Sequence, residues 1–170
     1  MSSQTLPVVF RATGTASQYS VSLEAYEAQS DAPSWWPARL TIAQDAAERS
    51  FDGRVHGLAG AAYVTFSSLV ERRGERHVHA DLLRGRLPPD GEARFDATFV
   101  PPNAAAQVRS LIHQSNIRGV PADIAMAAKQ EAARIRDDYG VPVSMEVVVA
   151  FDRAASRTAE VRRGLKAPGL

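Results

Sequence analysis

The sequence contains no cysteine, which excludes disulfide bonds, thiolate metal sites and a cysteine nucleophile. It also lacks an apolar run near the roughly 20 residues that a membrane-spanning helix needs. The segment Met1–Pro7 has neither the basic start nor the apolar core of a signal peptide. We therefore expect a soluble, cytoplasmic protein without a membrane partner.

Lysine is nearly absent, since 18 of the 20 basic residues are arginine. Arginine favours planar, bidentate contacts, although a GC-rich coding bias explains the same excess and is the explanation we prefer. The net charge of +1 gives no argument for a polyanionic partner. The charge is nevertheless uneven, because residues 1–60 carry 4 basic and 6 acidic groups whereas residues 61–170 carry 16 and 13.

A chain of 170 residues with 45% hydrophobic and 23% charged residues fits one ordinary domain with a real core. We find no internal repeat, low-complexity run or linker between domains. The sequence therefore predicts a single domain over residues 1–153. An arginine-bearing tail follows over residues 154–170, and we expect it to be mobile unless a partner holds it.

Residues 8–100 alternate between apolar and polar side chains, which is typical of strands. Gly14 and Thr15 are predicted to form the first turn, and the Ser, Asp and Pro content of Gln29–Pro37 predicts a loop. Ala46–Ser50 fits at most one helical turn. The predicted strands span 8–13, 19–25, 39–44, 51–58, 61–70, 76–84 and 93–100.

At Pro101 the pattern changes to that of helices. Asn103 is the expected N-cap of a helix over about 103–114, and a second helix over about 121–139 is expected to end at Gly140 in a left-handed cap. A final long strand covers about 141–151. The apolar stripe of the second helix is expected to lie on the sheet, and it consists of Ile124, Ala128, Ala132, Ile135 and Tyr139.

These elements predict an α+β domain. Its centre is a largely antiparallel β-sheet of about six to eight strands, with the two helices of the C-terminal half packed on one face.

One predicted strand places His77, His79 and Asp81 on the same face. Two imidazoles and a carboxylate can bind a divalent metal, and the order His-x-His-x-Asp resembles part of the metal-binding run of metallo-β-lactamase-like hydrolases. The run departs from that pattern because Leu82 stands where a histidine should follow the aspartate. An ordinary solvent-facing strand face explains these residues without a ligand, so we expect no bound metal and no cofactor.

A basic hairpin is the second candidate site. An arginine-lined ribbon fits a nucleic-acid groove, because each guanidinium can pair with phosphate. A charged hairpin that keeps a sheet edge from aggregating is the alternative interpretation. The candidate binding residues are Arg72, Arg73, Arg76, His77, His79, Arg84 and Arg86.

Trp35 and Trp36 form the third candidate site. Adjacent residues in an extended segment face opposite ways, so we expect one indole in the core and the other exposed. An exposed indole can stack on a base, a sugar or a protein partner, although packing at the rim of the core explains it as well.

These patterns predict a non-catalytic binding protein, with nucleic acid as the first partner to test. The first alternative is a self-assembling structural subunit, a homo-oligomer or a subunit that binds another protein. The second alternative is a small metal-dependent hydrolase that uses His77, His79 and Asp81.

Overall fold

The computed structural model describes residues 6–28, 33–60, 62–73, 76–87 and 93–152, with the backbone alone at 70–73 and 76–78. The predicted tail over 154–170 lies outside the described residues. Eight strands are present in the part of the chain that is described. They are β1 (Val8–Ala16), β2 (Tyr19–Tyr26), β3 (Trp35–Gln44), β4 (Ala47–His56), β5 (Tyr63–Arg73), β6 (Arg76–Arg86), β7 (Arg94–Phe99) and β8 (Val141–Val149).

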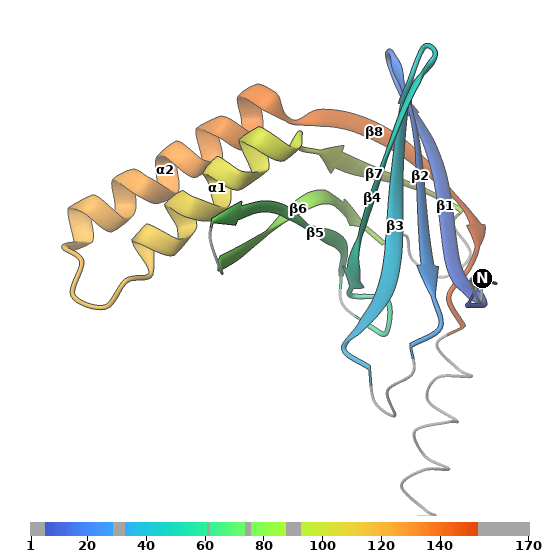
Figure 1. Ribbon diagram of the computed structural model, residues 1–170, viewed down its shortest axis with the longest axis horizontal. Helices are drawn as coiled ribbons and strands as arrows, with labels where there is room; N and C mark the ends of the chain where they lie inside the picture. The colour runs from blue at the N-terminus through green and yellow to red at the C-terminus, as the bar shows by residue number, and fades with distance from the viewer. Residues whose placement is uncertain (1–5, 29–32, 61, 74–75, 88–92, 153–170) are drawn as a thin grey trace, which may run out of the picture.

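The strands pair in antiparallel fashion in sequence order and close into a barrel (Figure 1). Closure depends on β8, which pairs with β7 on one side and with β1 on the other. The prediction of a largely antiparallel sheet is confirmed, but the sheet is not open. In an open sheet β1 and β7 would each present an edge of unpaired backbone N–H and C=O groups. Pairing with β8 covers both edges.

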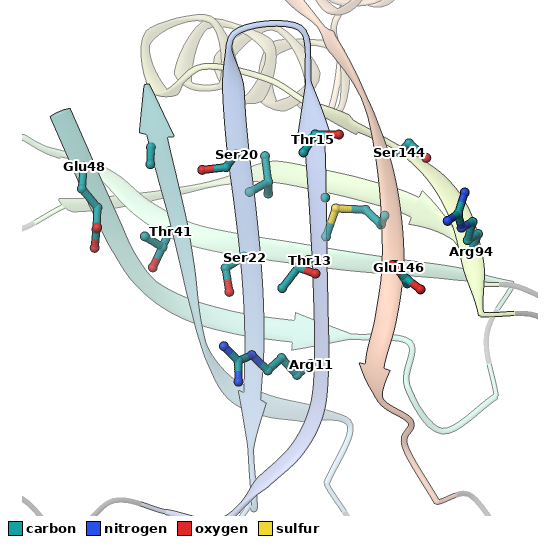
Figure 2. A pocket seen from close by; sticks show the side chains of 14 residues that line it. Arg11, Thr13, Thr15, Ser20, Ser22, Thr41, Glu48, Arg94, Ser144 and Glu146 are labelled. Carbon is teal, nitrogen blue, oxygen red and sulfur yellow. The ribbon is translucent and has the colours of Figure 1, made fainter. Parts of the chain in front are cut away.

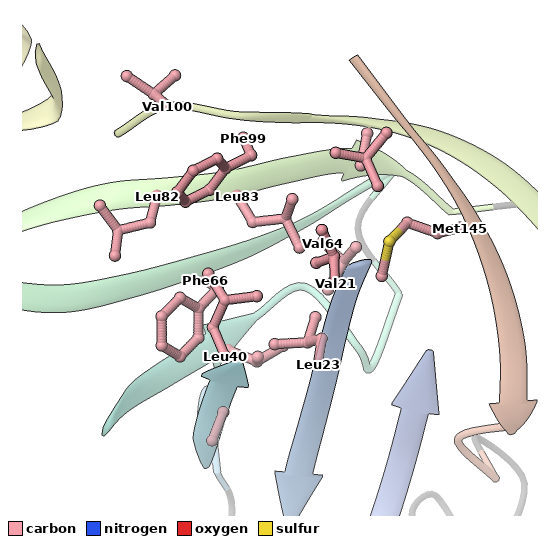
Figure 3. Close-up of a cluster of buried hydrophobic side chains, with 14 of the residues drawn as sticks. Val21, Leu23, Leu40, Val64, Phe66, Leu82, Leu83, Phe99, Val100 and Met145 are labelled. Carbon is pink, nitrogen blue, oxygen red and sulfur yellow. The ribbon is translucent and has the colours of Figure 1, made fainter. Parts of the chain in front are cut away.

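The barrel interior holds the hydrophobic core (Figure 3). Alternate residues of each strand point inward, and Leu23, Leu40 and Phe66 are completely buried. The fit is tight at Gly85, where an added Cβ would lie 2.8 Å from the ring of Phe95. These contacts fill the barrel with side chains rather than leaving a channel there.

A bulge in β6 changes the direction of its side chains. The register with β5 shifts between Phe66 and Ser67, so Leu82 and Leu83 are both buried although they are neighbours. The part of β6 that precedes Leu83 is not paired with β7, since the two strands pair only over Leu83–Gly85. The amide of Val100 still donates to the carbonyl of Leu82 at 2.8 Å, and the chain then leaves the sheet.

The two helices form a hairpin between β7 and β8 (Figure 1). Helix α1 (Pro102–Ser115) packs against β6, and helix α2 (Ala122–Tyr139) packs mainly on α1 rather than on the sheet. The expected position of α2 on the sheet was therefore wrong. Contact with α1 buries a narrower stripe of α2 than contact with a sheet would. Ala132 and Ile135 are therefore buried, while Ile124 and Tyr139 are more than half exposed.

Several local predictions are corrected by sheet pairing. Gly14 lies inside β1 rather than in a turn, and the turn follows at Ser17. Strand β8 approaches Gly14 so closely that only a glycine fits there. Ala47–His56 is one continuous strand, so the single helical turn does not form. Trp35 and Pro37 belong to β3 instead of a loop. Proline is tolerated at Pro37 because the pairing of β3 with β2 ends at Ala38 and does not include Pro37.

The helix caps also differ from expectation. Pro101 is the N-cap of α1, so Asn103 lies inside the helix and does not cap it. Gly140 ends α2 with φ −67° and ψ 134°, which is extended rather than left-handed. A Cβ at Gly140 would lie 2.4 Å from the carbonyl oxygen of Arg136 and 2.9 Å from a methyl of Thr98, so close packing explains this glycine. Neither helix in the described part of the chain is long and apolar enough to cross a membrane.

Candidate binding face

The outer surface of β3–β6 carries a row of neighbouring side chains that are far apart in the sequence. Backbone register places Trp35 beside His56, His56 beside Thr65, and Thr65 beside Arg84. Three further outward-facing residues lie two positions away on these strands, Tyr63 and Arg86 on one side of the row and Arg54 on the other. We call this surface the aromatic–arginine face, and it consists of Trp35, Arg54, His56, Tyr63, Arg84 and Arg86.

Two exposed aromatic rings on this face each have an arginine over them. The guanidinium carbon of Arg54 lies 4.2 Å from the centre of the Trp35 ring, and that of Arg84 lies 4.3 Å from the centre of the Tyr63 ring. The negative face of an aromatic ring attracts a cation, which holds each arginine beside its ring. Trp35 is 37% exposed and Tyr63 is 43% exposed, so both rings remain accessible from solvent.

The two adjacent tryptophans face opposite sides of β3. Trp36 points into the core, where it is 4% exposed and packs edge to face on Phe151 with ring centroids 5.0 Å apart. Trp35 is therefore the exposed indole of the pair, and alternation along a strand produces this arrangement. Of the two candidate residues, Trp35 alone can contact a ligand.

The predicted basic hairpin is formed by β5 and β6. The backbone register pairs Arg72 with His77 and Arg73 with Arg76, but the side chains of these four residues lie outside the described part of the structure. Arg84 and Arg86 are exposed on the aromatic–arginine face. The structure thus brings Arg84 and Arg86 together with Trp35, which the sequence alone did not predict.

His79 and Asp81 lie away from these rings, toward α1. Asp81 accepts a hydrogen bond from the hydroxyl of Ser67 at 3.1 Å. Among the described side chains, no three His, Asp or Glu residues lie close enough to hold a metal ion. The side chain of His77 is not among those described, so the metal-site interpretation stays a hypothesis.

A second row of charged residues crosses β1–β4 and is internally neutral. Arg39 is ion-paired with Asp52 at 2.9 Å, and Arg11 with Glu24 at 3.6 Å. The hydroxyl of Tyr26 donates to Glu24, and its pKa is raised first by burial and then by the charge of Glu24. The hydrogen bond that Arg39 donates to Asp52 raises the pKa of Arg39. These arginines are already matched by carboxylates, which makes them poor sites for phosphate.

A polar hollow of about 540 Å³ lies farther along the outer surface of β1, β2, β3 and β8 (Figure 2). Register places the hydroxyls of Thr41, Ser22 and Thr13 side by side across three strands. The rim charges balance, since Arg11 and Arg94 are accompanied by Glu48 and Glu146. A neutral hydroxyl-lined hollow offers no net attraction to a polyanion.

Sequence reasoning missed Arg54, His56 and Tyr63 of the aromatic–arginine face. Arg54 and His56 lie in a segment interrupted by Gly53 and Gly57, whereas Tyr63 lies in a predicted strand whose neighbouring strands local alternation does not specify, so none was assigned to a shared surface. The hydroxyl rows were also missed, although serine and threonine at every second position of 13–15 and 20–22 carried the signal.

Comparison of the chain with models of known protein families, with curated proteins and with solved structures finds no match. The function is therefore inferred from the chemistry of the surfaces described above.

Proposed function

We propose that the protein binds single-stranded nucleic acid on the aromatic–arginine face. The observation that carries this proposal is the repeated pairing of an exposed ring with an arginine, Trp35 with Arg54 and Tyr63 with Arg84, on one surface of the sheet. Exposed rings on a sheet stack on unpaired bases, and the arginines beside them contact phosphates.

The charge of this face supports the same ligand. Arg54, Arg84 and Arg86 supply three positive charges, and each is exposed. Two acids lie next to this surface: Asp52, two residues along β4 from Arg54, is ion-paired with Arg39, and Asp81, one strand beyond Ser67, accepts a hydrogen bond from it. A polyanion is thus attracted to β3–β6 rather than to the neutral surface of β1–β3 and β8.

The geometry favours a single strand over a duplex. Trp35 and Tyr63 lie on strands two positions apart in the sheet and are offset by two residues along them, which separates them by roughly 12 Å. Rings at this spacing contact different bases of one chain, and a base in a duplex does not expose its flat face. Strands β5 and β6 also carry Arg72, Arg73 and Arg76 farther along, at the tip of the hairpin.

The test is a titration of fluorescently labelled oligothymidylate at low salt. Tyr63→Ala should weaken binding by about 1–3 kcal/mol, the usual value of one base–aromatic stack. Tyr139→Ala is the matched control, because Tyr139 is an exposed tyrosine on α2, away from this face. Absence of binding at micromolar protein, or equal losses in the two variants, contradicts the proposal.

Self-association is the second candidate function. Helix α2 leaves Ile124 and Met126 55% and 61% exposed, and a second copy of the chain would bury such apolar side chains. Sedimentation equilibrium tests this candidate. Met126→Lys should lower the mass of any oligomer, and a monomer at all concentrations contradicts self-association.

A further inference from the structure

A cleft of about 300 Å³ lies between the outer face of β6 and the helical hairpin. It forms because β7 stops pairing with β6 at Leu83, and α1 takes its place beside the strand. A helix with its side chains is about 10 Å wide, whereas neighbouring strands lie about 4.8 Å apart. The substitution of a helix for a strand therefore leaves room next to Ser67, His79 and Asp81.

The inner wall of this cleft is apolar. Val100, at the end of β7, and Val108, on α1, are both buried, and the half-buried Ile112 continues the same helix face. A cleft with an apolar wall and a few polar groups has the composition of small-molecule sites.

The polar groups around the cleft include two arginines and a histidine. Arg109 comes from α1, Arg136 from α2 and His79 from β6, so three elements converge on one opening. The side chains of Arg109 and Arg136 have no ion pair or hydrogen bond within the described part of the chain. Asp81 is the carboxylate that lines the cleft, and it already accepts a hydrogen bond from Ser67.

We propose that this cleft binds a small amphipathic anion, with a carboxylate or phosphate head held by Arg109 and Arg136 and a short apolar body against Val108 and Ile112. The guanidinium group presents paired N–H donors that match both heads. The volume of about 300 Å³ is at the lower end of ligand sites, which limits the ligand to a small molecule. The residues that line the cleft differ from those of the aromatic–arginine face, although Ser67 is the register partner of Arg54, and the site does not depend on the nucleic-acid proposal.

The first test compares octanoate, octanol and octylamine by isothermal titration calorimetry on the full chain. The three probes share an apolar body and differ in the charge of the head. Octanoate should bind at least about 10-fold more tightly than octanol, as expected for a charge-assisted hydrogen bond, and octylamine should bind least. Octyl phosphate in a parallel titration shows which anionic head the cleft prefers.

The second test assigns the binding to the two arginines. Arg109→Gln and Arg136→Gln should each weaken the preferred anion by about 10-fold. Arg94→Gln is the matched control, because Arg94 is an exposed arginine at the polar hollow of β1–β3 and β8, and it should leave the affinity unchanged. Thermal unfolding of each variant confirms that the fold is intact.

Three results overturn the proposal. They are the absence of binding of both anions at millimolar concentration, equal affinity for octanol and octanoate, and an unchanged affinity in the Arg109→Gln, Arg136→Gln double variant. Failure of this proposal is distinguishable from failure of the nucleic-acid proposal, because Trp35→Ala should leave the binding of octanoate unchanged while it weakens the binding of oligothymidylate.

Discussion

Arg54 and Trp35 lie on adjacent strands, and the guanidinium carbon of Arg54 is 4.2 Å from the centre of the indole. Two strands farther along the barrel, Arg84 lies in the same way over Tyr63 at 4.3 Å. The register of β3–β6 produces both contacts, because in each pair the arginine lies diagonally across from the ring. The barrel thus presents two similar arginine–aromatic pairs on one outer surface.

The two tryptophans should separate stability from binding. Trp36→Ala should lower the free energy of unfolding by about 3–5 kcal/mol, because the indole is buried and packs on Phe151. Trp35→Ala should lower it by about 1 kcal/mol or less, the value of an exposed cation–π contact. Urea denaturation followed by circular dichroism measures both. A larger loss in Trp35→Ala than in Trp36→Ala would show that the assigned strand faces are reversed.

The buried stripe of α2 should tolerate no charge. Ile135→Asp should destabilise the protein by several kcal/mol, because Ile135 is 4% exposed and the new carboxylate has no partner there. Arg134→Gln is the neighbouring control, since Arg134 is exposed and its ion pairs with Glu131 and Asp138 lie at the surface. Similar shifts of the melting temperature in both variants would contradict the orientation of the helix.

The carboxyl group of Glu131 should titrate below the usual range. A hydrogen bond from Arg134 lowers its pKa, and the same contact raises the pKa of Arg134. Because the folded-state pKa is lowered, the stabilisation is present above the ordinary carboxyl pKa and is lost as the pH falls through the lowered value. An NMR titration should show the pKa of Glu131 rising in Arg134→Gln. An unchanged pKa in that variant would show that the contact is absent in solution.

Barrel closure should be sensitive to the size of residue 14. A Cβ at Gly14 would lie 2.5 Å from the carbonyl oxygen of Ser144 and 2.6 Å from the sulfur of Met145. Gly14→Ala should therefore cost about 1–3 kcal/mol, which exceeds the roughly 0.5–1 kcal/mol that alanine gains over glycine in a strand. Thr13→Ala, on the outer face, should cost less. A more stable Gly14→Ala variant would contradict the close approach of β1 and β8.

Local periodicity predicted most elements because it depends on residues near one another in the chain. The alternation in Tyr19–Tyr26 and the apolar spacing in α2 gave both elements nearly their observed bounds. Closure could not be predicted in this way, because it depends on β1 pairing with β8, from the opposite end of the sequence. The same is true of the contact between α2 and α1, which local spacing cannot distinguish from a contact with a sheet.

The candidate face was predicted as separate residues and not as a surface. Trp35, Arg84 and Arg86 were named because indoles and arginines are suited to nucleic acid, but their proximity results from the register of four strands. Tyr63 and Arg54 were missed for the same reason. Strand pairing between distant segments creates this surface, and no single segment of the sequence contains its pattern.

The most direct test of the account is the salt dependence of oligothymidylate binding to the wild-type chain and to a variant in which Arg54, Arg84 and Arg86 are all glutamine. For single strands, log K should fall with log salt by about 0.7 for each phosphate neutralised, because each contact releases a condensed counterion. Loss of three arginines should flatten the slope by about 2, with the melting temperature little changed. Equal slopes for the two proteins would contradict binding at the aromatic–arginine face.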